Sequence, residues 1–171
     1  MKKNLSSIFL VMLIVAIIVI VFISMSNAQS MTVIYKNNTT HQPIKIEKGK
    51  FQDSDCGMVI NELDYVSQVI SPNGNTWFFH DHGGMAHWVF DKSFKKDSTI
   101  LVWAKDVMQY IDGKKAWYSK TDDTPMHYGF GAYKNKKDGY VDFKTMSLLM
   151  MRGENLTNPQ VKKQLLKDME K

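Results

Sequence analysis

The sequence predicts an α+β protein in which short strands and short helices alternate behind a long apolar N-terminal helix. Residues 8–23 are apolar without a break. Beyond them, apolar segments at the strand period are separated by turns rich in glycine, proline and asparagine. The last residues, 160–171, place apolar side chains on one side of a helical pattern, which predicts a C-terminal helix.

The first half of the body is expected to follow the order strand, strand, helix, strand. Residues 65–70 and 76–80 are typical of two strands, and Asn73-Gly74 between them strongly indicates a hairpin. Gly83-Gly84 ends the second strand, residues 85–90 fit one or two helical turns, and residues 100–103 form the next strand. Residues 44–47 alternate at the strand period and would pair with this sheet.

The second half repeats this order loosely. Residues 116–118 and part of 126–133 are predicted strands, and residues 141–151 are a predicted helix that Gly153 ends. Asn158-Pro159 supplies an N-cap and a first-turn proline for the C-terminal helix. The expected boundaries are 1–25 for a membrane anchor or uncleaved signal, 26–50 for a tether, 51–152 for the main domain and 153–171 for the C-terminal helix.

The apolar run predicts a membrane anchor. Extended to Met25 it has eighteen residues, and at ~1.5 Å per residue it spans ~27 Å of a hydrocarbon core of ~30 Å. Because Lys2 and Lys3 precede it, we expect a single-pass inner-membrane protein with a cytoplasmic N-terminus and a periplasmic body. A signal peptide cleaved at 26–28 is the alternative, although the run exceeds the usual apolar region of ~7–15 residues. No lipobox cysteine is present, so a lipid anchor is excluded.

Composition excludes nucleic acid as a partner. The chain has 22 Lys and Arg residues against 17 Asp and Glu, a surplus that is too small and too scattered for a nucleic-acid interface. Cys56 is the one cysteine, so outside the cytoplasm it has no disulfide partner in its own chain. A bound metal would protect this thiol from oxidation.

Cys56 and Met58 leave the same short turn, and together they offer a thiolate and a thioether. Such soft sulfur donors select Cu(I) over metals that prefer oxygen. A buried free cysteine beside a core methionine is the competing interpretation. The glycine between them and the flanking Asp53 and Asp55 favour partial exposure instead.

Two further groups of donors lie later in the chain. Met126 and His127 follow Pro125 and precede two glycines, so a tight surface loop is expected to carry them. His80 and His82 would share one face of a strand, with Met85 nearby, and imidazoles so placed can bind Cu(II), Ni(II) or Zn(II). Solvated histidines without a ligand are the alternative in both places.

These residues together resemble one family. The resemblance covers residues 51–152 and is carried, in order, by residues 55–60 (DCGMVI), 68–70 (QVI), 76–79 (TWFF), 102–118 (VWAKDVMQYIDGKKAWY) and 124–132 (TPMHYGFGA). In this order they are similar to the NosL family, the accessory copper proteins of nitrous oxide reductase assembly.

The resemblance implies a periplasmic Cu(I) chaperone that is not an enzyme, with two related ββαβ-type halves. It carries Cu(I) ligands over to Cys56, Met58 and Met126, with His127, His80, His82 and Met85 as further candidates. The implied partners are nitrous oxide reductase and its ABC-type maturation complex. Two departures from the family are the transmembrane anchor in place of a lipid anchor and the histidine-rich 80–85 segment.

Two other functions compete with the chaperone. An exported thiol enzyme would use Cys56, activated by a histidine. No supporting oxyanion arrangement is evident, and the aspartates beside Cys56 would raise the thiol pKa where a nucleophile needs it lowered. The other alternative is a membrane-anchored assembly or scaffold factor that binds no metal.

Overall fold

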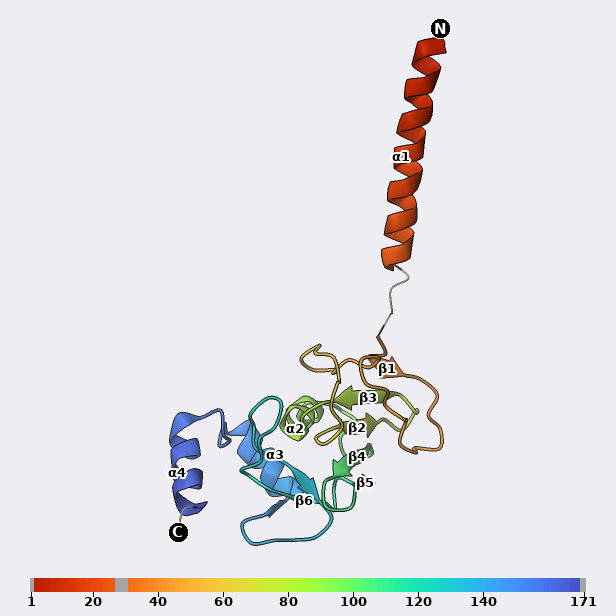
Figure 1. Ribbon diagram of the computed structural model, residues 1–171. Helices are drawn as coiled ribbons and strands as arrows, with labels where there is room; N and C mark the ends of the chain where they lie inside the picture. Colours follow the sequence, from red (N-terminus) through yellow and green to blue (C-terminus); the bar gives the residue numbers. More distant parts are fainter. Residues whose placement is uncertain (1, 27–30, 170–171) are drawn as a thin grey trace. The chain divides into compact units, whose positions relative to one another are not determined.

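The chain divides into two compact units, Met1–Met31 and Thr32–Lys171. The computed structural model describes residues 2–26 and 31–169, with side chains for 8–24, 31–165 and 167 (Figure 1). The first unit contains helix α1 (Lys2–Ser26). Within the described residues, no helix combines the length and the apolar character that crossing a membrane requires, so the membrane-spanning helix expected at 1–25 is not supported. Residues 27 and 28 of the candidate cleavage site and residues 27–30 of the tether lie outside the described residues.

The body is built on a five-stranded antiparallel sheet. Its strand order is β1-β3-β2-β4-β5. The strands are β1 (Ile34–Tyr35), β2 (Ser67–Ile70), β3 (Thr76–Phe79), β4 (Thr99–Ala104) and β5 (Gln109–Asp112). The predicted hairpin is confirmed, since Ile70 pairs with Thr76 and the amide of Gly74 donates to the carbonyl of Ser71 at 2.9 Å. Strands β1 and β5 were not predicted, because β1 has two residues and β5 lacks a clean alternation.

Helix α2 (His82–Phe90) lies over one face of this sheet and completes the predicted strand, strand, helix, strand order (Figure 1). It begins three residues earlier than predicted, because Asp81 caps it by accepting a hydrogen bond from the amide of Gly83 at 2.8 Å. The main core lies between this helix, the sheet and helix α3. It contains thirteen buried residues: Val69, Phe79, Met85, Ala86, Val89, Ile100, Val102, Ala116, Tyr118, Phe130, Ala132, Met146 and Met150.

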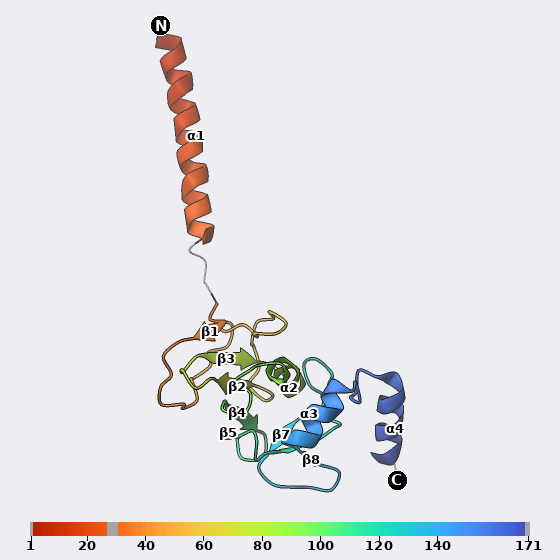
Figure 2. The same ribbon diagram turned by 180° about the vertical axis from the view of Figure 1, so that it is seen from behind.

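The second half departs from the expected ββαβ order. It has a three-stranded antiparallel sheet in the order β7-β6-β8, formed by β6 (Trp117–Tyr118), β7 (Ala132–Tyr133) and β8 (Val141–Asp142). Helix α3 (Phe143–Met151) follows β8 directly, and α4 (Pro159–Met169) is the next element (Figure 2). No strand follows α3 in the described residues, so the two halves share the α+β class but not one topology. The predicted helix at 141–151 starts later because its first two residues form β8 and Asp142 caps α3.

The segment 44–66 covers the other face of the five-stranded sheet. It contributes to a second core of Ile46, Phe51, Ile60, Val66 and Phe78. The strand predicted at 44–47 is absent. Instead, the Gln68 side chain accepts a hydrogen bond from the amide of Ile44 at 2.9 Å and donates one to its carbonyl at 2.8 Å. A side-chain amide thus makes the backbone hydrogen bonds of Ile44 that a neighbouring strand would otherwise make.

Candidate metal site

The turn at 53–58 is organised by the side chain of Asp53. Its Oδ1 accepts hydrogen bonds from the amides of Asp55 at 2.8 Å and Cys56 at 3.1 Å. The Asp53 amide donates to the carbonyl of Met58 at 2.8 Å and closes the turn. Gly57 has φ +75°, a left-handed conformation that glycine adopts without steric cost. Cys56 and Met58 therefore leave the turn from a fixed backbone.

The second carboxylate oxygen of Asp53 holds His80, the residue after β3. Oδ2 accepts hydrogen bonds from the His80 amide at 2.8 Å and from its ring Nδ1 at 2.6 Å. Both side chains are buried, with 3% and 8% exposure. Burial raises the pKa of Asp53, but the hydrogen bonds from His80 and from the turn outweigh it and the pKa is lowered. An ionised carboxylate fixes the proton on Nδ1 and leaves Nε2 with a free lone pair, as in many metal-binding histidines.

Cys56 completes a three-residue group with this pair. Its Sγ lies 3.8 Å from Nδ1 of His80, and one ligand atom from each of Asp53, Cys56 and His80 falls within 4.8 Å of the others. The thiol is exposed. Desolvation is the largest influence on its pKa and raises it; the backbone amide of Met58 opposes this, and the charges of Asp53 and Asp55 add to it. Metal binding at this thiol would therefore release a proton.

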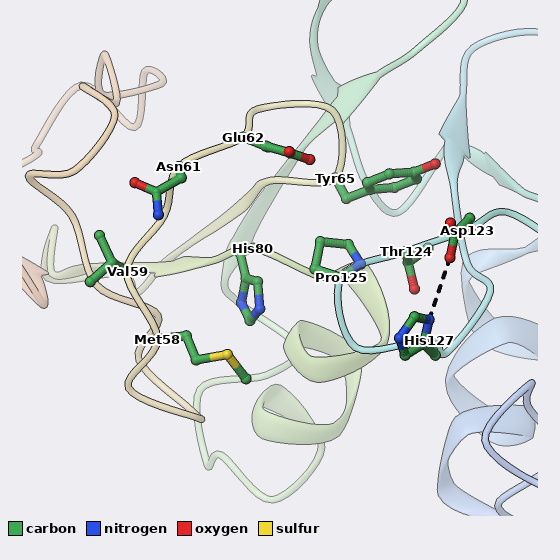
Figure 3. Close-up of a pocket in the computed structure, with 10 residues that line it drawn as sticks. All are labelled: Met58, Val59, Asn61, Glu62, Tyr65, His80, Asp123, Thr124, Pro125 and His127. Carbon is green, nitrogen blue, oxygen red and sulfur yellow. Dashed lines mark ion pairs between the residues drawn. The ribbon is translucent and has the colours of Figure 1, made fainter.

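A pocket of about 400 Å³ opens beside this group. Figure 3 shows the thioether of Met58 and the ring of His80 on one side, and Pro125 and His127 on the other. Met58 is 47% exposed. The pocket is lined by Met58, Val59, Asn61, Glu62, Tyr65, His80, Asp123, Thr124, Pro125 and His127. The C-x-M turn and the Pro-Met loop, 70 positions apart in the sequence, thus face each other.

The Pro-Met loop, which carries Pro125 and Met126, is hydrogen-bonded to Asp81, the residue after His80. The amide of Met126, which is half-buried, donates to Oδ2 of Asp81 at 3.0 Å. Tyr128 packs so closely on α2 that a Cβ on Gly83 would lie 2.7 Å from its side chain. His127 has φ +56° and is exposed at the rim, with Nδ1 3.4 Å from a carboxylate oxygen of Asp123. Both sulfur-bearing loops are therefore anchored at the corner between β3 and α2.

Of the predicted ligands, Met58, His80 and His127 line the pocket, whereas Cys56 and Met126 belong to the two flanking loops without lining it, and His82 and Met85 are buried away from it. His82 is fully buried because α2 begins there, so it does not share a strand face with His80. Its ring lies between Tyr65 and Tyr118 at 6.3 and 6.1 Å, and neither ring nitrogen has a hydrogen-bond partner among the described residues. Burial lowers the pKa of His82 to about 3. Met85 is also fully buried, in the main core.

A charged network lies behind the pocket wall formed by Tyr65. Oδ2 of Asp122 accepts hydrogen bonds from Lys105 Nζ at 3.0 Å and from the Tyr133 hydroxyl at 2.9 Å. Lys105 Nζ also donates to the Tyr65 hydroxyl at 2.7 Å. Burial raises the pKa of Asp122, but the hydrogen bonds from Ser119, Lys105 and Tyr133 outweigh it and lower the pKa. The network ties β4 to the start of the Pro-Met loop.

Comparisons with family models, curated proteins and solved structures found no match. The chemistry of the site therefore has to be judged from its donors. A thiol, an imidazole nitrogen and nearby thioethers form a soft donor set, suited to Cu(I) or Zn(II) and poorly suited to Mg²⁺ or Ca²⁺.

The arrangement does not favour thiol catalysis. A catalytic thiol–imidazole–carboxylate triad offers one ring nitrogen to the thiol and the other to the carboxylate. Here Cys56 and Asp53 both face Nδ1 of His80, which already donates its proton to Asp53. This nitrogen cannot take a proton from the thiol.

Two residues that organise the site were not among the predicted ligands. Asp53 and Asp81 each hold one loop through backbone amides. The only signal in the sequence is an aspartate two or three residues before the amides that donate hydrogen bonds to it, a spacing typical of Asx turns. That spacing explains the contacts of Asp53 with its own turn. It does not predict the contacts of either aspartate with distant residues.

Proposed function

We propose that this chain is an exported Cu(I)-binding metallochaperone that delivers copper for the assembly of nitrous oxide reductase. Cys56 supplies the thiolate, and Met58 and Met126 supply thioethers. His80 supplies Nε2 as a further ligand, and His127 at the rim is available during transfer. The resemblance of residues 51–152 to the NosL family suggests the destination and the ABC-type maturation complex as partners.

The observation that carries the proposal is the contact between Asp53 and His80 beside Cys56. A carboxylate that accepts from Nδ1 at 2.6 Å orients the imidazole and directs the opposite nitrogen away from the carboxylate. Ligating histidines in metal sites have such partners as a rule. Cys56 Sγ lies 3.8 Å from Nδ1 of the same ring, so a sulfur and an imidazole stand side by side. For the thiolate to share an ion with Nε2, the Cys56 side chain has to rotate from Nδ1 towards the opposite edge of the ring.

The openness of the site supports transfer more than storage. Cys56 and Met58 are exposed, and the pocket between the two loops gives a partner protein access to the ion. Structural metal sites are closed by four protein ligands, whereas catalytic sites keep a position open for an incoming ligand. A site that passes its ion to a partner protein needs the same open position, for a ligand of the partner. Two or three soft ligands at the mouth of a pocket meet this requirement.

Competition for Cu(I) against a chromogenic chelator, under anaerobic conditions, tests the binding. We expect one Cu(I) per chain in the wild type. Cys56→Ser should weaken binding by more than the tenfold to hundredfold that the loss of an outer-shell partner costs. Met58→Ala and Met126→Ala should each weaken it, while Met108→Ala, which removes an exposed methionine from another turn, should not. Wild-type affinity in Cys56→Ser would refute the copper site.

Maturation assays separate the chaperone from the two competing functions. If Cys56→Ser and Met126→Ala both restored full nitrous oxide reductase activity in cells, a scaffold without metal would be favoured. If apo protein were alkylated rapidly at Cys56 and Cu(I) did not block the reaction, a thiol enzyme would be favoured.

The proposed location has a reporter in the chain itself. We propose that the body lies on the periplasmic side of the inner membrane, as the lysines before the apolar run suggest. Because Cys56 is the one cysteine and is exposed, a maleimide that does not cross the inner membrane should label it in intact cells. Labelling only after lysis would place the body in the cytoplasm and refute the proposed location.

A further inference from the structure

Aromatic side chains gather on the surface of the body at the end of α2. The rings of Trp77 and Trp88 lie 5.1 Å apart, and Phe94 stacks on Trp77 at 5.2 Å with an angle of 13°. All three are half-buried, and Phe90 is 37% exposed. Together with Lys92 and Lys95, which lie over two of these rings, these residues form what we call the aromatic–lysine surface. It contains none of the residues proposed to hold copper.

Edge strand β1 extends this surface. Ile34 pairs with Trp77 across the strands, so the two side chains lie on the same face of the sheet. Ile34 is 44% exposed, whereas Tyr35 pairs with Thr76 and lies on the opposite face of the sheet. Contiguous apolar exposure of this kind marks an interaction site on a protein or a membrane.

Lysines stand over the aromatic rings. Nζ of Lys92 lies 4.3 Å from the ring centre of Trp88, and Nζ of Lys95 lies 3.8 Å from that of Phe90. Cations are attracted to ring faces, and a lysine so placed covers apolar surface with its stem while its charge stays in water. The surface therefore alternates apolar rings with lysines, and the exposed Asp91 and Asp97 of the same segment reduce its positive charge without cancelling it.

Lys95 and Lys96, in the turn after α2, form one wall of a basic pocket of about 390 Å³. Four lysines line it, with Phe143 and a single acid: Lys95, Lys96, Lys114 and Lys144, with Asp142. The carboxylate of Asp142 caps α3, because it accepts a hydrogen bond from the amide of Thr145 at 2.7 Å. Lys114 donates through Nζ to the carbonyl of Lys96 at 3.0 Å, which fixes the wall of the pocket. The pocket has an excess of positive charge suited to a phosphate group.

We propose that the aromatic–lysine surface docks the body on a bilayer that contains anionic phospholipid, with a headgroup phosphate in the lysine pocket. Tryptophan favours the membrane–water interface, and lysines close to an anionic leaflet add attraction. A protein partner would need to match rings and lysines in alternation, whereas a lipid surface offers both an apolar layer and phosphates over the whole area. The proposal is independent of the copper site.

Quenching of tryptophan fluorescence by brominated phosphatidylglycerol tests the docking. All four tryptophans belong to the body, so the full chain, reconstituted in vesicles, reports on the body alone. The variants are Lys95→Gln/Lys96→Gln on the surface and Lys45→Gln/Lys48→Gln as a control that removes the same charge elsewhere. Residues 8–23 are identical in all of them, so their own lipid contacts cannot produce a difference.

We expect quenching in the wild type and the control. Each lysine near an anionic surface contributes about fivefold, the equivalent of about 1 kcal/mol, so the surface variant should lower the ratio of docked to undocked body about 30-fold. Equal quenching in both variants, absence of quenching, or the same quenching with brominated phosphatidylcholine would each overturn the proposal. Binding of inorganic phosphate in the pocket without quenching would also overturn it and would leave only a site for a free anion.

Discussion

Replacing Asp53 by asparagine tests whether one carboxylate organises the metal site. The side chain keeps its shape, but only one of its two terminal atoms can still accept hydrogen bonds. If the oxygen stays on the amides of Asp55 and Cys56, the new NH₂ group faces two donors of His80. The imidazole would have to move its proton to Nε2, and the buried His80 amide would lose its partner.

The magnitude follows from the bonds lost. Hydrogen bonds to a charged group contribute about 1.5–3 kcal/mol each, and a buried donor left unpaired costs about 1–3 kcal/mol. With partial relaxation, Asp53→Asn should lower the free energy of unfolding by about 3 kcal/mol. For a body of this size the melting temperature should fall by roughly 10 °C. Because Nε2 would carry the proton, Cu(I) affinity should fall about tenfold to hundredfold.

Thermal unfolding and chelator competition on the same samples measure both effects. Asp55→Asn is the matched control, since this exposed neighbour lies 3.9 Å from His87 in a loose ion pair and should change the unfolding free energy by less than about 0.5 kcal/mol. If Asp53→Asn unfolded at the wild-type temperature and bound Cu(I) with wild-type affinity, the carboxylate would not organise the site and the proposed ligand geometry would be wrong.

Three more predictions concern the surroundings of the site. His82→Leu should leave Cu(I) affinity unchanged and keep or raise the free energy of unfolding by about 1 kcal/mol, because it removes a buried ring without hydrogen bonds; a loss of copper binding would restore His82 as a ligand. Gly83→Ala should cost about 1–3 kcal/mol and weaken Cu(I) binding, since the added Cβ displaces Tyr128, whereas Gly84→Ala meets nothing closer than 3.9 Å and should be neutral or stabilising in urea unfolding. Asp122→Asn should cost about 1–3 kcal/mol at pH 7. The pKa of Asp122 is lower in the folded than in the unfolded chain, so the stabilisation by its carboxylate is fully present above the unfolded pKa of about 3.9 and is lost as the pH falls through the folded pKa. In Asp122→Asn, the free energy of unfolding should therefore depend less on pH in that acidic range. The same acid dependence in the variant and the wild type would contradict this.

Local signals in the sequence predicted most of the first half of the body. The Asn73-Gly74 turn set the register of the hairpin, and the glycine pair marked the change from strand to helix. The strand expected at 44–47 is absent because a distant side chain, Gln68, satisfies the backbone of Ile44. Strands of two residues, such as β1 and β8, have no periodicity to read and depend on tertiary pairing.

The sequence predicted the two loops of the site but not how the two histidines divide between the site and the core. The turn that carries Cys56 and Met58, and the loop that carries Met126, were expected at the surface, and the pocket places the two loops opposite each other. His80 and His82 looked alike in the sequence. The cap that Asp81 makes between them starts α2 and sends one ring to the site and the other into the core. Such a division depends on where the helix begins, which alternation alone does not fix.

The two oxygens of Asp81 have different consequences for the lifetime of a bound ion. One caps the first turn of α2, and the other accepts the amide of Met126. The second bond can break while the helix start stays intact, at a cost of about 1.5–3 kcal/mol, so roughly one molecule in ten to one in a hundred would have this bond open at any instant, with Tyr128 still packed on α2. An ion held by Met126 would then lose this ligand on the timescale of a local fluctuation, without waiting for the sheet to unfold.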